Sequence, residues 1–159
     1  MGFALSDMQL KSTDFAAHGP IPSQFTGEGE DVSPQLSWEN APAGTKSIAI
    51  ICHDPDAPLI SANGTYGFVH WVLYNLPGST TELETASQLG TQGKNDFGNL
   101  GYGGPMPPPG HGQHHYYFWV LALDIETDLP EGQSMWQALE QLEPHIIGAN
   151  RLIGTYQRA

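Results

Sequence analysis

The residues that could carry chemistry are concentrated in three short segments of the chain. They read "CHDPDAP" at 52–58, "GFVHWVLYN" at 67–75 and "PPPGHGQHHYYF" at 107–118. Together they supply carboxylates, imidazoles and phenols, which are groups that ligate metals, transfer protons or hold anions. The choice among these chemistries depends on which side chains point toward one another.

The first segment places two carboxylates beside a proline. Asp54 and Asp56 flank Pro55, and His53 precedes them. A residue before proline is restricted to extended backbone, so the segment is expected to hold both carboxylates on a stiff loop at the end of a strand. Asp before Pro also commonly caps a turn. The doubled pattern next to a histidine favours a site over a turn alone.

The second segment places one histidine inside a predicted strand. Alternation of side chains along a strand separates His70, Val72 and Tyr74 on one face from Val69, Trp71 and Leu73 on the other. His70 is therefore expected to point away from Trp71. A buried histidine with one hydrogen-bonded nitrogen also fits this position without any further function.

The third segment contains three histidines that alternation should keep apart. In an extended chain His114 and Tyr116 project to one side, and His115 projects to the opposite side. His111 lies between two glycines, and we expect it to be a solvent-facing loop residue. The three imidazoles are therefore not expected to form one cluster.

A metal site and a nucleophilic enzyme both find little support in these segments. Zinc sites use about three or four ligands at defined spacings, and neither HExxH nor HxH occurs. Asp54, His70 and His114 could form a facial triad, so a metal-assisted or acid–base hydrolase is one alternative. GxSxG is absent, and Cys52 lies in an apolar strand where its thiol should be inert. We predict no metal and no cofactor.

An anion pocket accounts for more of these residues. A loop rich in Gly and Pro exposes backbone N–H groups, and histidine donates hydrogen bonds and becomes cationic as the pH falls. A nearby Asp orients a histidine or receives a cationic ligand group. Tyr116 and Phe68 could supply aromatic walls. Such a pocket suits a zwitterion, with phosphate on the histidine side and an amine on the Asp side.

Composition limits the partners of this chain. A length of 159 residues suits a single domain over 1–159. The formal net charge of −12 disfavours broad binding to nucleic acid or anionic membranes. The sequence contains neither a signal-peptide pattern nor the roughly 18 apolar residues of a membrane span. We therefore expect a cytoplasmic protein without a transmembrane segment.

The elements that must position these residues are mainly strands. We expect an early strand within 1–15, then strands at 35–38, 47–53, 68–77, 115–124 and 151–157. One helix is expected over 134–142, because Ser134 and Gln137 have the spacing of a capping box. With so few helices the chain cannot be built from βαβ units. The prediction is a mainly β protein, a β-sandwich with one or two short helices.

Several motifs in order resemble the phosphatidylethanolamine-binding protein family, in particular its bacterial Raf-kinase-inhibitor-like branch. They are "FTGEGEDVSPQLSWENAPAGTKS", "DPDAP", "HWVLYN", "GYGGPMPPPGHGQHHYYF" with "ALD", and "LIGTYQR", and they cover roughly 8–158. The resemblance implies a β-sandwich with a small, preformed anion pocket. It also implies a non-catalytic binder of phosphate, acetate or phosphoethanolamine, with a regulatory or kinase-inhibitor-like role. The pocket residues it implies are Asp54, Asp56, His70, Pro107, Pro108, His114 and Tyr116.

The chain also departs from the family pattern. The family usually has arginine where this chain has His115, so a permanent charge becomes a titratable one whose partner we expect to be an Asp. The C-terminal helix that lines the pocket in eukaryotic members has no counterpart after "GTYQRA", which predicts a more open pocket. A homodimer is compatible with the resemblance. A protein-interaction module that modulates a kinase or a protease is a further alternative, although no residue specifies such a partner.

Overall fold

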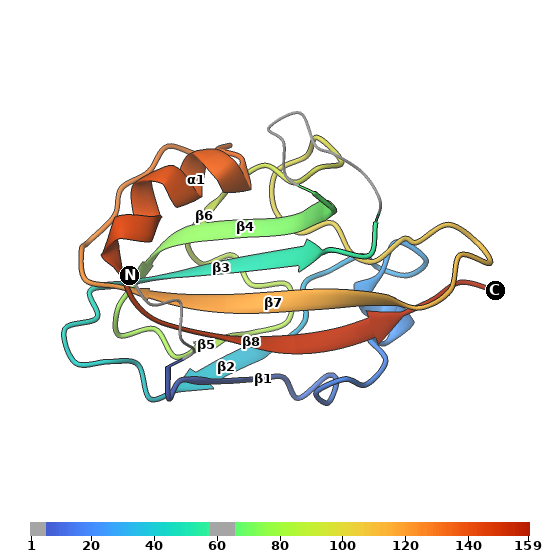
Figure 1. Cartoon of the computed structure of the whole chain (residues 1–159), viewed down its shortest axis with the longest axis horizontal. Coiled ribbons are helices and arrows are strands. Elements are labelled where there is room, and N and C mark those ends of the chain that lie inside the picture. The colour runs from blue at the N-terminus through green and yellow to red at the C-terminus, as the bar shows by residue number, and fades with distance from the viewer. Residues whose placement is uncertain (1–5, 58–65) are drawn as a thin grey trace.

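The computed structural model describes residues 6–57 and 66–159 and contains two antiparallel sheets (Figure 1). The smaller sheet has the order β1-β2-β5, with β1 at Gln9–Lys11, β2 at Leu36–Glu39 and β5 at Glu82–Leu83. The larger sheet has the order β6-β4-β3-β7-β8. Its strands are β3 (Ser47–Asp54), β4 (Phe68–Pro77), β6 (Thr91–Gln92), β7 (His114–Leu123) and β8 (Ile146–Tyr156). The fold is therefore mainly β, as predicted.

The main hydrophobic core lies between the two sheets. Inward-facing side chains that alternate along the strands fill it, and they include Trp38, Ile50, Trp71, Phe118 and Leu152. Because each regular strand of an antiparallel sheet turns every second side chain inward, the strand periodicity of the sequence accounts for most of this layer.

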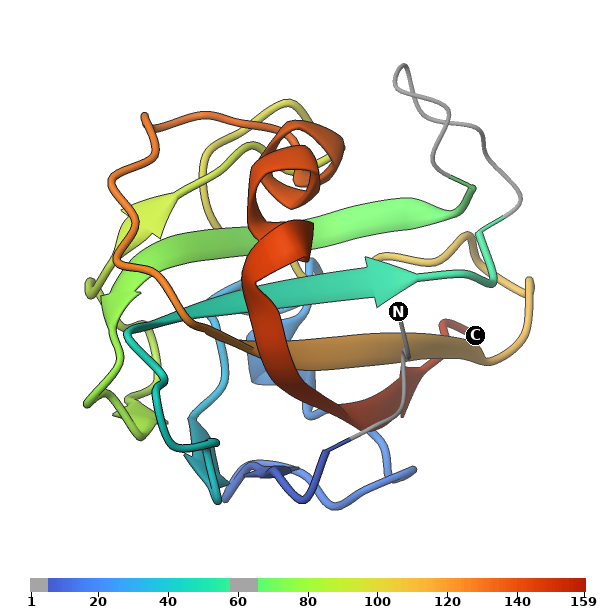
Figure 2. The same cartoon turned by 60° about the vertical axis from the view of Figure 1, so that its left-hand side comes forward.

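A second, smaller core lies on the outer face of the larger sheet. The helix α1 (Met135–Leu142) packs there and buries Ala138 and Leu142 against Ile51, Val72 and Leu121 (Figure 2). The Ser134 side chain caps the helix and the Gln137 side chain returns to the Ser134 backbone, so the predicted capping box is confirmed. Two short 3-10 helices lie at Ser23–Phe25 and Glu143–His145. No helix within 6–57 or 66–159 is long and apolar enough to cross a membrane.

The predicted strands agree with the observed ones, apart from the last strand and two very short ones. β8 begins at Ile146 rather than at 151, because pairing with β7 extends it through a Gly- and Asn-containing stretch that has no clear alternation. The two-residue strands β5 and β6 were not predicted, since two residues carry no periodicity. The early strand is β1, and the part of that prediction in 1–5 lies outside the described residues.

β4 contains a bulge that changes which way His70 points. The pairing register shifts between Cys52 and His53, and His70 is the extra residue on β4. His70 therefore lies on the inner side of the sheet, where its ring is 5.1 Å from that of Tyr116 between centroids. The expectation that His70 points away from Trp71 is wrong, because Trp71 also belongs to the inner core.

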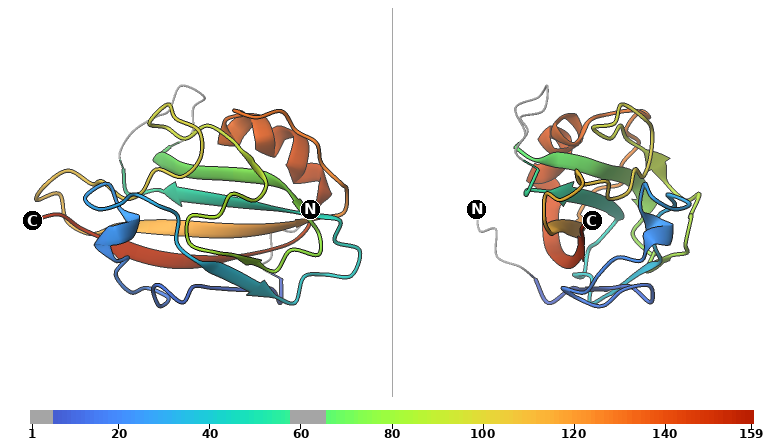
Figure 3. Two further views of the ribbon diagram at one scale, coloured as in Figure 1. Left: turned by 180° about the vertical axis from the view of Figure 1, so that it is seen from behind. Right: turned by 90° about the vertical axis from the view of Figure 1, so that its right-hand side faces the viewer.

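The elements that carry the candidate residues converge at one end of the larger sheet. Antiparallel pairing places the end of β3 opposite the start of β4 and the start of β7 opposite the end of β8. Figure 3 shows this end of the sheet, with the C-terminus beside it. Segments that are far apart in sequence therefore surround one location.

Candidate functional site

A cavity of about 170 Å³ lies at this end of the sheet. It contains most of the residues that the sequence predicted, and its lining is Asp54, Ala57, Phe68, His70, Phe97, Met106, Pro107, Pro108, His114 and Tyr116. Asp56 does not line it. Pro58, which closes the Asp-Pro segment, lies outside the described residues. The structure therefore brings six of the seven predicted residues together.

A buried carboxylate–imidazole pair forms one wall of the cavity. His114 Nδ1 lies 2.7 Å from Asp54 Oδ2, and both side chains are only 4% exposed. Asp54 Oδ1 accepts a hydrogen bond from the Asp56 backbone N–H at 2.8 Å. An ionised carboxylate only accepts hydrogen bonds, so the His114 Nδ1–H donates. This bond fixes the ring and leaves Nε2 as the nitrogen of His114 that can meet another group.

His111 meets that nitrogen. His111 Nδ1 lies 2.7 Å from His114 Nε2, so one of the two nitrogens donates to the other. When His114 is neutral with its proton on Nδ1, the donor is His111. His111 is an exposed loop residue, as expected, but it also contacts His114, which the alternation argument did not predict. The three side chains form a chain from the exposed His111 through His114 to the buried Asp54, and an anion at His114 Nε2 must displace or share the His111 contact.

His70 forms a second polar point in the cavity. Its Nδ1 donates to the Gly103 carbonyl at 2.6 Å, and the ring is almost completely buried. Burial lowers the pKa of His70 below its ordinary value, and this outweighs the opposing effects of the Gly103 carbonyl and the Asp54 charge. His70 is therefore neutral at neutral pH. Because Nδ1 carries the proton, Nε2 of the neutral ring can only accept a hydrogen bond. It becomes a donor when the ring takes up a second proton.

Aromatic and apolar groups complete the lining. Tyr116 is buried, and burial raises its pKa so that the phenol stays neutral. Phe97 and Met106 form part of the rim, and they are 46% and 40% exposed. Sequence reasoning missed both of them. Phe97 sits in a loop that Asn95 shapes by accepting the Phe97 backbone N–H at 3.0 Å, and such a loop has no strand or helix periodicity.

Asp56 and His115 form a separate pair beside the cavity. The backbone N–H and Nδ1–H of His115 both donate to Asp56 Oδ2, at 2.7 and 2.6 Å. Partial burial tends to raise the pKa of Asp56, but the hydrogen bonds from His115 outweigh it and lower that pKa. The predictions that His115 points away from the pocket and that an Asp partners it are confirmed. The Asp56 carboxylate thus holds the loop after β3 against β7 and does not enter the cavity.

Substituting His115→Arg tests the pairing of this position with Asp56. An arginine carries a permanent positive charge beside the Asp56 carboxylate, so the variant should be more stable than the unaltered protein at pH 8. The gain should be below about 1 kcal/mol, because both side chains are partly exposed. Urea unfolding at pH 8 measures this gain in the free energy of unfolding. The same substitution in an Asp56→Asn background should give no gain, and an equal gain there would contradict the pairing.

The segment after β8 holds the proline wall. Arg158 Nη1 donates to the Pro107 carbonyl at 3.2 Å, and the Gly110 N–H donates to the Arg158 carbonyl at 3.2 Å. Glu28 lies 3.4 Å from Arg158 Nε and accepts from the Tyr156 hydroxyl at 2.6 Å. Sequence reasoning missed Arg158, because its partners come from segments far apart in the chain.

The remaining reactive groups do not add to this site. Within 6–57 and 66–159, no three His, Cys, Asp or Glu side chains are grouped as metal ligands. Burial, together with the Asp54 charge, raises the pKa of the Cys52 thiol well above its ordinary value, so Cys52 is unreactive.

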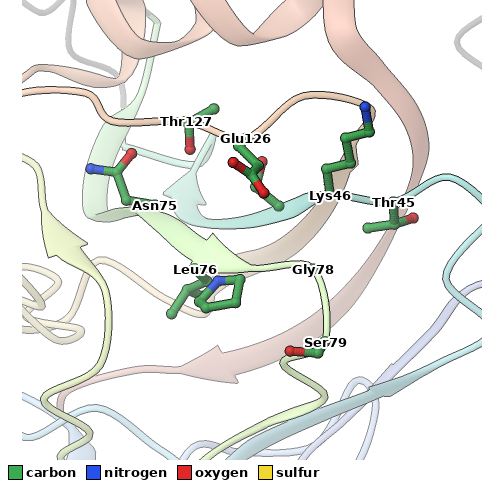
Figure 4. Close-up of a pocket in the computed structure, with 10 residues that line it drawn as sticks. Thr45, Lys46, Asn75, Leu76, Gly78, Ser79, Glu126 and Thr127 are labelled. Carbon is green, nitrogen blue, oxygen red and sulfur yellow. The ribbon is translucent and has the colours of Figure 1, made fainter.

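A larger hollow of about 520 Å³ lies at the opposite end of β3 and β4 (Figure 4). Some of its polar groups join local segments. The Ser47 hydroxyl donates to the Ile125 carbonyl at 2.5 Å, and Asn75 exchanges hydrogen bonds with the backbone of Leu129. This hollow contains no histidine. The smaller cavity is therefore the stronger candidate for a functional site.

Comparison with known proteins identifies a family and several relatives that this chain resembles. The family described as phosphatidylethanolamine-binding protein matches residues 11–157. A UPF0098 protein of Methanothermobacter thermautotrophicus is 44% identical over 158 residues, covering 95% of this chain and 99% of its own. A UPF0098 protein of Aquifex aeolicus is 42% identical, with 95% and 89% covered.

Solved structures show the same relationship. A putative phosphatidylethanolamine-binding protein homologue from Chlamydia trachomatis superposes with a TM-score of 0.86 at 37% identity, covering 96% of this chain and 98% of its own. YbcL of E. coli, described as a member of the mammalian PEBP family, superposes with a TM-score of 0.87 at 31% identity, covering 97% and 100%. The sequence match and the shared fold agree, and the chain belongs to the phosphatidylethanolamine-binding protein family.

Proposed function

We propose that this protein is a non-catalytic binder of a small anion of the phosphate, acetate or phosphoethanolamine type. The observation that carries the proposal is the buried Asp54–His114 pair, which faces a preformed cavity together with His70. Two imidazoles in one small cavity can donate hydrogen bonds to an anion, and the Asp54 carboxylate fixes the orientation of the His114 ring. Family membership supports the same class of ligand.

The size and charge of the molecule narrow the ligand further. A cavity of about 170 Å³ accepts a phosphate or carboxylate group with few additional atoms. The formal charge of −12 opposes polyanions such as nucleic acid. A single anionic group that is desolvated inside the cavity is therefore the ligand that the site suits best.

Protonation determines which form of the anion binds. At neutral pH His70 presents a lone pair on Nε2, because its Nδ1 proton is committed to the Gly103 carbonyl. A phosphate monoanion carries a proton of its own and can donate it to that lone pair. A fully deprotonated anion instead requires that His70 first be protonated.

NMR titration of the histidine side chains tests the proposal. Phosphate and phosphoethanolamine at millimolar concentration should shift the ring signals of His70, His114 and His111. His145 provides an internal control, since it pairs with Asp124 at 3.0 Å away from the cavity and should not respond. If the cavity histidines keep their shifts at millimolar ligand, or move only as much as His145, the protein is not such a binder.

A second function has one specific observation in its favour. The Asp54–His114–His111 chain has the carboxylate–imidazole arrangement of a general base. We propose an acid–base hydrolase as the alternative to binding alone. Turnover of an activated phosphate or acyl ester that a His114→Gln variant loses would support the hydrolase, and equal background rates in both proteins would leave binding as the function.

A further inference from the structure

Both ring nitrogens of His114 are engaged by other side chains in this structure. Nδ1 donates to Asp54, and Nε2 lies 2.7 Å from His111 Nδ1. Whichever of the two imidazoles donates in the second contact, His114 Nε2 has no capacity left for a further hydrogen bond. His111 is not among the residues that line the cavity. A ligand inside the cavity therefore meets no free nitrogen of His114 unless His111 moves away.

His111 stands on the exposed tip of a loop, where its release costs little. Every residue of 108–113 is exposed, and the loop projects beyond the start of β7 beside the C-terminus (Figure 1 and Figure 3). A released His111 ring exchanges its partner for water, which costs much less than leaving a buried polar group unpaired. The contact with His114 is therefore one that a ligand can replace.

Two glycines flank His111 and allow the tip to move by itself. Gly110 and Gly112 have φ angles of +71° and +94°, in the left-handed region that favours glycine. A Cβ at either position would meet no atom within 4 Å, so the tip does not pack against other segments. Among the described residues, the hydrogen bond of the His111 side chain is the one that joins 111–113 to the rest of the protein.

The root of the same loop is held independently of His111. Arg158 Nη1 donates to the Pro107 carbonyl and the Gly110 N–H donates to the Arg158 carbonyl, both at 3.2 Å. Pro107 is buried, and Glu28 lies 3.4 Å from Arg158 Nε. The proline wall of the cavity can therefore stay in place while the tip that carries His111 moves.

We propose that His111 is an internal competitor of the anion. Its ring occupies His114 Nε2 in the free protein, and an anion gains contact with that nitrogen only by displacing it. The displaced ring turns to solvent about Gly110 and Gly112. This inference rests on the proposed anion binding and adds regulation to it, because the affinity then depends on a loop residue outside the lining of the cavity.

Calorimetric titration with sulfate at pH 7 tests the competition. His111→Ala should bind sulfate about threefold to tenfold more tightly than the unaltered protein, because no exposed hydrogen bond between imidazoles has to break first. Gln113→Ala is the matched control, since Gln113 is exposed in the same loop and makes no side-chain hydrogen bond with the described residues. This control should bind sulfate with unchanged affinity.

NMR of the two rings shows directly whether His111 leaves. The ring centroids of His111 and His114 are 5.0 Å apart, so proton–proton contacts between the rings should be observed in the free protein. Saturating sulfate should abolish these contacts and move the His111 ring signals to the positions of a histidine in solvent.

The outcomes separate the competitor from the proposed function. If sulfate binds the unaltered protein but binds His111→Ala equally or more weakly, or if the contacts between the rings persist in the complex, His111 is not a competitor and the proposed anion binding stands. Sulfate binding to His111→Ala alone would show that the imidazole closes the site completely. If sulfate binds neither protein, the proposed function fails and the competitor fails with it.

Discussion

Replacing Asp54 with alanine is expected to destabilise the protein by about 3 kcal/mol, because it removes one partner of a buried pair. The substitution leaves the His114 Nδ1–H without its carboxylate acceptor at a position where both side chains are only 4% exposed. It also removes the acceptor of the Asp56 backbone N–H. In a chain of this size such a loss should lower the unfolding temperature by about 10 °C.

Urea unfolding at pH 7 measures this loss, and Asp56→Ala provides the control. Asp56 also accepts from a histidine, but both side chains of that pair are partly exposed, so its removal should cost below about 1 kcal/mol. Asp54→Asn should fall between the two, since the amide oxygen can still accept from Asp56. Equal losses for Asp54→Ala and Asp56→Ala would show that burial does not distinguish the two acids.

The sequence was sufficient for the strands and for much of the cavity, because both follow from periodicity. Ser47–Asp54 and His114–Leu123 turn alternate side chains inward, and this alternation correctly separated His114 and Tyr116 from His115. Alternation failed at His70, where a single extra residue on β4 reverses the facing of the strand's start. Bulges of this kind depend on the pairing of two strands, so one strand's pattern does not reveal them.

The rest of the site depends on contacts between loops, and loop sequences have no repeating pattern of apolar and polar residues from which such contacts can be predicted. His111 reaches His114 because the proline-rich loop folds back, and Arg158 holds that loop through the Pro107 carbonyl. Asp56 sits beside Asp54 in sequence but turns to His115 instead of the cavity. The composition of the site was therefore predictable to a large extent, whereas the division of its acids between cavity and loop support was not.

Sulfate affinity should rise by about tenfold for each unit by which the pH falls, if one proton is taken up on binding. Sulfate remains a dianion with no proton to donate across this range. His70 Nε2 must therefore be protonated before it can donate to sulfate, and burial makes this protonation unfavourable in the free protein. The negative charge of the bound sulfate offsets the cost of protonating the buried His70. Sulfate binding and proton uptake at His70 are therefore coupled. Calorimetry between pH 8 and pH 5.5 gives the slope.

Phosphate provides a contrast to sulfate in the same experiment. Its monoanion can donate a proton to the neutral His70, so its affinity should change less steeply with pH than that of sulfate. His70→Gln should flatten the sulfate slope, because an amide donates a hydrogen bond at every pH. His145→Gln, away from the cavity, should leave it unchanged. A sulfate affinity that is independent of pH in the unaltered protein would exclude proton uptake at His70.

The stability of the unliganded protein should fall as the pH falls, whereas sulfate affinity should rise. Both effects act through His70. Burial lowers the pKa of His70 in the folded state below the ordinary value of 6.5, so the unfolded chain takes up the proton first. The contribution of His70 to stability is therefore present above pH 6.5 and is lost as the pH falls below it. Sulfate should offset this loss, and it should raise the unfolding temperature more at pH 5.5 than at pH 8. His70→Gln should remove both the acid-dependent loss and the pH-dependent part of the rescue, which links the two effects to one imidazole.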